Sequence, residues 1–544
     1  MIKKIIEEFE YKQTQRKNWE GQWAEVARYF LPHHSQDFSM TNEDEEPGEK
    51  RGDDIYSSVP IIALSRFVGI VDGLLTPLDK KWHTLKPKNP NLDRHEVNKW
   101  FDKLNKALFQ YRYNPSSNFA AQNSMRWEQM GAFGTGVLFI DYDHKDKLRY
   151  KCLDIKNITL GENHQGIINR VDRFFHLTVP EIREQFGDKV VLSEEMRKVL
   201  NSKEENKKKF PILHTVLPAS HEDKRHKDGT ANKVKYTSYY IDFKDKRELK
   251  KEYYNSFPFS ISRYSVSPEE MFGRSPAMQV MADVIRLNKK ESRKMKAVDR
   301  LLDPVILAQG DYLTAGGLEI DMRPNSVIMG GIDQNGNPTV RPFSDGSQVD
   351  IALEDIDRLE KSINDAFLIT LFQIMVDNPR MTATEALIRV QEKSMLLTPI
   401  VAKQQSEALS PLIERELSIL MDNNLIDEPP FDLGDNGLYD IMYESPLNKM
   451  QESEALVGLN KVITTLAPLA QIDPTFFNRI DNPKALELAM EAAGLPAEIL
   501  KDKDVYDEEV AEMKAKEDAM FEQQQAESLG KVVSDLAGAG GAGQ

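Results

Sequence analysis

Two stretches of clustered charge contain the side chains of this sequence that are best placed to do chemistry. In the first, between Arg286 and Arg300, seven basic residues outnumber two acidic ones, which gives a local balance of +5. Clustered cations bind phosphate groups, so this stretch could face a nucleic acid. The basic residues are Arg286, Lys289, Lys290, Arg293, Lys294, Lys296 and Arg300.

The second charged stretch, Gln348 to Phe372, has the opposite sign, because six acids outnumber two bases and give a balance of -4. Two interpretations stay open: the basic residues line a path for DNA, or they pair with these acids in the same chain or in a neighbouring subunit. Exposed pairs add only about 0–1 kcal/mol each, so pairing would mainly align subunits. The acids are Asp350, Glu354, Asp355, Asp357, Glu360 and Asp365.

Gly131, Gly134 and Gly136 form a glycine-rich stretch that could cradle a phosphate. In nucleotide-binding proteins such a stretch lies between a strand and a helix, and a phosphate loop adds Lys followed by Ser or Thr. Here the glycines precede a predicted strand and the Lys-Ser/Thr pair is missing. We therefore expect no nucleotide site. No Walker A motif occurs elsewhere, which argues against an ATP-driven motor.

Asp141, Asp143 and Asp146 have a spacing that could hold calcium, but the glycine and terminal Glu of an EF-hand loop are missing. The preferred interpretation is a solvated hairpin turn. His221 and His226 lie in a charged stretch without Cys or carboxylates at ligand spacing, so we expect no metal site and no cofactor. No Ser/His/Asp set stands out, although residues far apart in sequence can form one, so a hydrolase stays open.

Composition excludes several classes of protein. The chain has 544 residues, of which 40% are hydrophobic and 29% charged, as is typical of soluble globular proteins with long helices. Its one cysteine, Cys152, excludes a disulfide framework and fits a reducing cytoplasm. The net charge of -16 argues against a protein that grips duplex DNA, although not against one through which DNA passes.

The elements that position these residues follow from periodicity. We predict helices at 2–30, 58–76, 93–112 and 117–132. Val59 to Leu75 is apolar but contains Arg66 and Asp72, so it should be a buried helix rather than a membrane span. β-Branched and aromatic runs at 136–175 and 210–266 predict a mixed α+β region, with a polar hairpin tip at 221–233.

The charged stretches belong to two predicted amphipathic helices, 276–302 and 348–372, with an insertion between them. Asn335-Gly336 predicts a β-hairpin inside that insertion. A short loop then precedes a long helix that starts at a Thr382-x-x-Glu385 capping box. Pro399 and Pro411 should kink this helix, because each removes one hydrogen bond. The last residues, 536–544, should be disordered.

Five segments, in this order, resemble the portal, or head-to-tail connector, proteins of short-tailed bacteriophages. They are IYSSVPIIALSRFVGIVDGLLTPLDKKWHTL, MGAFGTGVLFIDYD, EEMFGRSPAMQVMADVIRLN, NPRMTATEALIRVQEK and YESPLNKMQ. The likeness covers roughly residues 1–500, and the order of the segments is more specific than any one of them. It implies a mainly helical α+β portal fold that forms a ring, usually of twelve subunits, at one vertex of the capsid.

The resemblance also implies how the chain is divided. The regions are a wing (1–275), stem helix 1 (276–302), a clip (303–346), stem helix 2 (347–371), a channel loop with the kinked wing helix and the following segment (372–449), a helical crown (450–525) and a flexible tail (526–544). It places Asp377, Asn378, Pro379, Arg380 and Met381 in the channel loop facing DNA. In the clip, it implies motor and tail contacts through Asn325, Met329, Asn335, Gly336 and Arg341.

The resemblance implies a non-enzymatic role and a set of partners. Double-stranded DNA would be packaged through the ring by the terminase large subunit and later ejected. The other partners would be further copies of the chain, the major capsid protein and scaffold, a tail adaptor, and internal ejection proteins, with no membrane. The protein would occupy the virion, and the host cytoplasm before assembly. A structural scaffold or capsid-completion protein without a channel remains the alternative.

Overall fold

A computed structural model describes residues 1–40, 48, 51–78, 80–88, 95–188, 190–201, 207–220, 234–302, 306–308, 335, 340–342, 349–370, 397–427, 439–443, 513 and 516. The chain divides into two compact units. The first comprises Met1–Lys80 and Tyr111–Asp422, and the second comprises Lys81–Gln110 and Asn423–Gln544. Residues 81–110, which the resemblance implied to be part of the wing, group with the C-terminal part of the chain.

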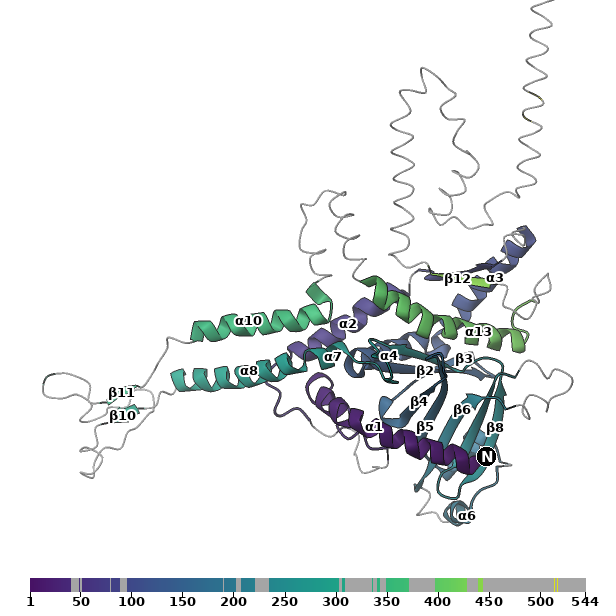
Figure 1. Cartoon of the computed structure of the whole chain (residues 1–544), viewed down its shortest axis with the longest axis horizontal. Coiled ribbons are helices and arrows are strands. Elements are labelled where there is room, and N and C mark those ends of the chain that lie inside the picture. Colours follow the sequence, from purple (N-terminus) through teal and green to yellow (C-terminus); the bar gives the residue numbers. More distant parts are fainter. Residues whose placement is uncertain are drawn as a thin grey trace, which may run out of the picture. The chain divides into compact units, whose positions relative to one another are not determined.

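An antiparallel five-stranded sheet forms one layer of the first unit. Its strands, in spatial order, are β4 (Ile158–Glu162), β5 (Ile168–Thr178), β6 (Lys209–Pro218), β7 (Tyr236–Asp242) and β8 (Arg247–Tyr254). Helix α1 (Ile2–Phe30) lies along this sheet (Figure 1). Its Ile5, Ile6 and Phe9 share a core cluster with Leu213 and Ile241. The helix forms because its apolar residues recur at helical spacing and face the sheet.

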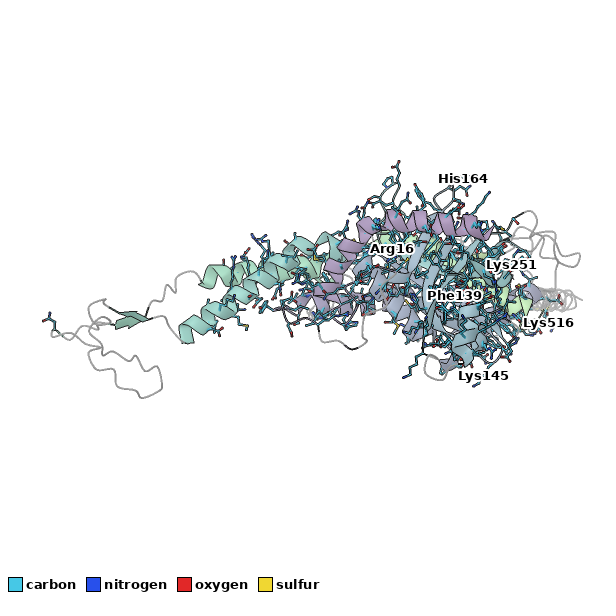
Figure 2. All side chains as sticks on the ribbon, turned by 90° about the horizontal axis from the view of Figure 1, so that it is seen from below. Arg16, Phe139, Lys145, His164, Lys251 and Lys516 are labelled. Carbon is cyan, nitrogen blue, oxygen red and sulfur yellow. The ribbon has the colours of Figure 1, made fainter. Side chains whose placement is uncertain are left out.

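The opposite side of this sheet carries aromatic and polar side chains. His214 stacks on Tyr240 with their ring centroids 4.1 Å apart, and Phe139 of a second sheet meets His214 at 5.7 Å. Figure 2 shows Phe139 inside the body formed by the strands. Two short helices, α5 (Val179–Phe186) and α6 (Glu194–Asn201), close a separate apolar cluster beside β6.

The second sheet has three antiparallel strands in the order β3 (Lys147–Leu153), β2 (Thr135–Asp143) and β9 (Phe259–Arg263). Helix α4 (Phe119–Phe133) leads directly into β2 through Gly134, whose φ of 80° is left-handed. A Cβ at Gly136 would lie 2.2 Å from the carbonyl oxygen of Arg126. The glycine stretch is therefore a tight helix-to-strand turn.

The first unit also contains helix α2 (Val59–Leu75), which packs on α4 and buries Ala63, Leu64 and Phe67. This confirms the prediction of a buried helix at these positions. Among the residues described, no helix combines the length and the apolar character that crossing a membrane requires.

The long helix predicted around Pro399 and Pro411 is described from residue 397 to 422. Helix α13 (Ser410–Asp422) follows a π-helical turn, η6 (Gln405–Leu409), so the interruption takes the form of one wide turn. Pro411 lacks an N–H and its ring would clash with the carbonyl four residues back, which a wider turn relieves. Ser260 Oγ donates to the Ala408 carbonyl at 2.7 Å.

Buried charges fix α13 to the rest of the first unit. Arg112 Nε donates to both carboxylate oxygens of Glu416 at 3.0 and 3.1 Å, and Tyr150 OH donates to Glu416 at 2.6 Å. Both partners of this ion pair are fully buried. Removing one partner of such a pair typically costs about 3–5 kcal/mol, because the other charge is left without compensation.

The second unit pairs β1 (His83–Pro87) with β12 (Tyr439–Tyr443) in an antiparallel ladder. Helix α3 (His95–Arg112) belongs mostly to this unit, and its Asn105 binds the backbone N–H and carbonyl of Leu85 at 2.9 and 3.2 Å. Trp100 donates through Nε1 to the Asp427 carbonyl at 3.0 Å. Asp93, the predicted cap of α3, lies outside the described residues.

The predicted secondary structure is largely confirmed where the structure describes it. The 2–30 helix is α1, the mixed region contains β2 to β9, and the predicted helix at 276–302 is α7 (Pro276–Gln279) followed by α8 (Met281–Leu302). The other charged helix is α10 (Val349–Ala366). The hairpin tip at 221–233 and the residues after 443, apart from 513 and 516, fall outside the described residues.

Candidate functional site: a charged helical hairpin

Helices α8 and α10 lie side by side in both views (Figure 1, Figure 2) and form an antiparallel hairpin. The direction follows from two contacts: Ser362 Oγ donates to Asp283 Oδ2 at 2.9 Å, and Lys290 bonds Asp355. The first pair lies near the root of the hairpin, which we define as the end where α8 begins and α10 ends. The second pair lies towards the far end. The hairpin therefore presents charged side chains along a long exposed element.

The root of the hairpin is buried in the core of the first unit. Leu287 is buried on α8, and Ile363 is buried on α10. Phe367, just after α10, packs its ring against Phe30 of α1 at 5.5 Å and Phe67 of α2 at 5.7 Å. At the start, Ser275 Oγ accepts from the Met278 N–H at 3.0 Å and caps α7. Within the part of the chain that the structure describes, these contacts hold the hairpin at its root.

Asn288 is an anchor that the sequence analysis missed. Its Oδ1 accepts from the Tyr56 N–H at 2.7 Å, and its Nδ2 donates to the Asp54 carbonyl at 2.9 Å. It therefore ties α8 to a segment more than 230 residues earlier. The signal in the sequence was an amide next to the apolar stripe that includes Val284 and Leu287. Ser362 and Asp283 were missed too, and no sequence pattern marks them.

The structure brings several of the predicted charges together. Asp355 pairs with two cations of α8, Lys290 and Arg286, the second at 3.6 Å. Arg358 of its own helix donates to it at 2.7 Å. Its side chain is 20% exposed. Lys294 pairs with Glu291 at 3.2 Å along α8. Asp355 thus pairs with three cations. Because partly exposed ion pairs add little stability, their main effect is to fix which sides of the two helices face each other.

Other predicted charges have no ion-pair partner in the part of the chain that the structure describes. Within the described residues no hydrogen bond or ion pair engages the exposed Lys289, Arg293 and Lys296 of α8, or Glu354 and Asp357 of α10. Glu360 is half-buried, and its pKa is raised mainly by that burial and further by the nearby Asp357 carboxylate. The described charges of the hairpin therefore fall into a group paired around Asp355 and an exposed group without a described partner.

The remaining predicted site residues are only partly described. The backbones of Arg300 and Asp350 belong to α8 and α10, but their side chains lie outside the described residues. Beyond the helices, β10 (Ile306–Ala308) pairs with β11 (Val340–Pro342), where Arg341 is opposite Leu307, and Asn335 is in a turn. Further positions lie outside the described residues: Asn325, Met329, Gly336, and Asp377, Asn378, Pro379, Arg380 and Met381 of the predicted channel loop.

The motif at Asp141, Asp143 and Asp146 is a hairpin turn, as predicted. Asp143 accepts from the backbone N–H of Lys145 at 2.7 Å and of Asp146 at 3.0 Å, between β2 and β3. These bonds to the charged form lower the pKa of Asp143. Lys145 projects at the edge of the body (Figure 2). No group of three or more potential metal ligands occurs in the described part, and His221 and His226 lie outside it.

Comparison with known proteins points in one direction. A family model described as "Bacteriophage head to tail connecting protein" matches residues 2–500. A "Probable portal protein" of Bordetella phage BPP-1 is 25% identical over 494 residues, covering 90% of this chain and 86% of that protein. A "Portal protein" of Salmonella phage epsilon15 is 24% identical over 503 residues, covering 91% and 88%.

One solved structure, described as the neck of an empty GTA particle, is also similar to this chain. Its TM-score is 0.34 at 12% identity, and the match covers 74% of this chain and 86% of that one. Such a distant likeness supports no structural argument.

Proposed function

Because this chain belongs to the family of bacteriophage head to tail connecting proteins, we propose that copies of it close into a ring around a channel for double-stranded DNA. Its function is that of a portal protein, a virion component where the phage head meets the tail. The observation that carries this is the extent of the match, since the family spans residues 2–500 and each relative covers about nine tenths of the chain.

The α8–α10 hairpin supports a more detailed assignment as the stem of the portal. Its root is buried in the first unit, while its far end leads into the β10–β11 pair. Two antiparallel helices that lead into a small β pair support the assignment to the stem and clip that the resemblance implies. We assign α7 and α8 to stem helix 1, α10 to stem helix 2, and residues 303–346 to the clip.

The other regions are assigned from the family resemblance. The sheets and helices of 1–275 contribute the wing, residues 450–525 the crown, and Asp377–Met381 the channel loop. Within the loop, Asp377 and Arg380 would meet phosphates weakly, so that DNA is not retained. The net charge of -16 per chain favours such sliding, because a ring would carry a strongly negative field.

The proposed partners follow from the position at the vertex. The major capsid protein and scaffold would surround the ring, and the terminase large subunit would dock on the clip during packaging. A tail adaptor would take its place afterwards, and internal ejection proteins could contact the crown. Assembly would start in the host cytoplasm. The protein would supply no catalysis of its own, leaving ATP hydrolysis to the motor.

Negative-stain electron microscopy of the purified full chain, with its mass in solution, tests this function. We expect ring-shaped particles with a central hole and a mass that is a whole multiple of 62.2 kDa. Compact or elongated particles without a hole, under all assembly conditions tried, would favour the alternative of a scaffold or capsid-completion protein.

A further inference from the structure

Most of the exposed charges of the hairpin that have no described partner are sorted by helix, with Asp299 on α8 and Lys361 on α10 as the exceptions. On α8, Lys289, Arg293 and Lys296 are four and three residues apart, so they line up along one flank. On α10, Glu354 and Asp357 are three residues apart and share a flank in the same way. All five are exposed and engage no partner among the described residues. Lys361 lies on the α10 flank as well, but nearer the root.

The two flanks lie on the same face of the hairpin. With 3.6 residues per turn, the α8 cations lie about 60–120° to one side of Lys290, and the α10 acids lie about 100–160° to the same side of Asp355. Lys290 and Asp355 face each other. In an antiparallel pair of helices, side chains that are rotated in the same sense away from the line of contact lie on the same face of the pair, when each rotation is counted along its own helix towards the C-terminus. The hairpin therefore has a basic flank beside an acidic one.

Each outer edge of the hairpin also exposes an apolar side chain. Met295 is 58% exposed and Leu353 is 38% exposed. They lie about 140° from Lys290 and about 160° from Asp355 respectively, almost directly away from the partner helix. Along the axis they are about 7.5 Å and about 3 Å beyond the Lys290–Asp355 contact, both towards the far end. The two edges therefore carry their apolar residues at similar heights.

We propose that neighbouring copies join α8 of one hairpin to α10 of the next, with Met295 against Leu353 and Lys289 and Lys296 facing Glu354 and Asp357. This rests on the proposed ring. Copies in one orientation around an axis place a basic flank next to an acidic one at every junction, whereas a two-fold contact of like edges would set equal charges together. A contact between two different edges is the kind that closes rings.

The charges set the alignment of this junction more than its strength. An exposed ion pair contributes little, but like charges placed together exclude a partner strongly. Charge reversal is therefore a sharper test than removal to alanine. Two variants test this alignment: the double change Lys289→Glu with Lys296→Glu, called the α8 variant, and Glu354→Lys with Asp357→Lys, called the α10 variant.

Ring assembly of these full-length variants, followed by electron microscopy and sedimentation at about 150 mM salt, decides the proposal. Each variant alone should need at least tenfold more protein than the parent for half-maximal assembly. An equimolar mixture should assemble again, since the reversed α8 of one chain meets the reversed α10 of the other. A chain with all four changes should also assemble.

The matched control is Lys3→Glu with Lys4→Glu, which changes the charge equally on the exposed surface of α1 and should assemble like the parent. Met295→Lys provides a test that leaves the flanks intact, and it should weaken assembly in all combinations. The thermal unfolding of each variant checks that it folds.

Three results would overturn the inference. If the α8 variant forms rings as readily as the parent, the flank has another purpose, such as facing DNA, while the ring itself stands. If the four-change chain assembles but the mixture does not, these charges pair within one chain. A parent that never forms rings removes the proposed function and the inference together.

Discussion

His34 sits in a loop beside Asp154, with its Nε2 3.3 Å from Asp154 Oδ2 and its Nδ1 2.9 Å from the Ser35 carbonyl. Burial acts to lower the pKa of His34, but the bond and charge of Asp154 outweigh it, so the pKa is raised. The same contact lowers the pKa of Asp154 below its usual value despite burial. The charged pair is thus favoured in mildly acidic solution.

We expect His34→Gln to destabilise the protein most near pH 5.5. A raised pKa means that the pair stabilises fully below the unfolded value of about 6.5, and that this contribution fades as the pH rises through the folded pKa. Thermal unfolding of parent and variant from pH 5.5 to 8.5 measures the difference. A gap that stays constant over this range would show that the charge of His34 contributes nothing.

His214 should respond to pH with the opposite sign. It is fully buried, donates or accepts through Nε2 with Ser238 Oγ at 2.9 Å, and has its pKa lowered well below 6.5 by burial and by Arg173. The folded protein keeps it neutral, so the unfolded chain takes up the proton first. This contribution is present above about pH 6.5 and is lost as the pH falls, by up to about 1.4 kcal/mol per unit.

His214→Gln should therefore flatten the loss of stability between pH 6.5 and 5, even though the variant is less stable overall. Denaturant titrations at several pH values give the slope. His164→Gln is the matched control, because His164 is exposed on the surface (Figure 2) and its replacement should leave the slope unchanged. Equal slopes for the parent and His214→Gln would contradict the assignment.

At the scale of elements, two glycines of this chain, Gly131 and Gly69, have different structural roles. A Cβ at Gly131 of α4 would lie 2.8 Å from Leu64 Cδ1 and Phe67 Cδ1 of α2, whereas a Cβ at Gly69 would meet nothing within 4 Å. The first glycine allows two helices to approach closely. The second costs helix stability without a packing reason inside the described part of the chain.

Alanine at these two positions should have opposite effects. Gly131→Ala should lower the free energy of unfolding by about 1–3 kcal/mol through overpacking, and Gly69→Ala should raise it by about 0.5–1 kcal/mol through helix propensity. Chemical denaturation of the unassembled protein measures both. A neutral Gly131→Ala would mean that α2 and α4 do not pack as described.

The α8–α10 hairpin shows which features of an element can be predicted from the sequence and which cannot. Periodic apolar residues predicted both helices, because side chains of one helix face recur at a fixed spacing. The sequence left open whether its cations line a path for DNA or pair with the acids of the same chain or of a neighbouring subunit. In the structure Lys290 and Arg286 pair with Asp355, whereas Lys289 and Lys296 are exposed and have no partner among the described residues.

At the scale of the whole molecule, the predicted channel loop provides the test of DNA handling. Arg380 is its one cation, and this position lies outside the described residues. If it meets phosphates, Arg380→Ala should leave ring assembly intact but reduce DNA packaging or retention several-fold. Packaging assays with rings of parent and variant measure this, with a charge change on the surface, such as Lys4→Ala, as the control. Equal packaging and retention would remove the proposed role.

The sequence by itself determined the family, the helices α1, α2, α8 and α10, and the mixed region of strands, because periodicity and ordered motifs are properties of neighbouring residues. Tertiary structure alone decided which distant residues meet. Arg112 bonds Glu416, Asn288 holds the backbone of Asp54 and Tyr56, and Asp355 gathers cations from two helices. Those pairings depend on how the core brings remote segments together, and no local pattern encodes that packing.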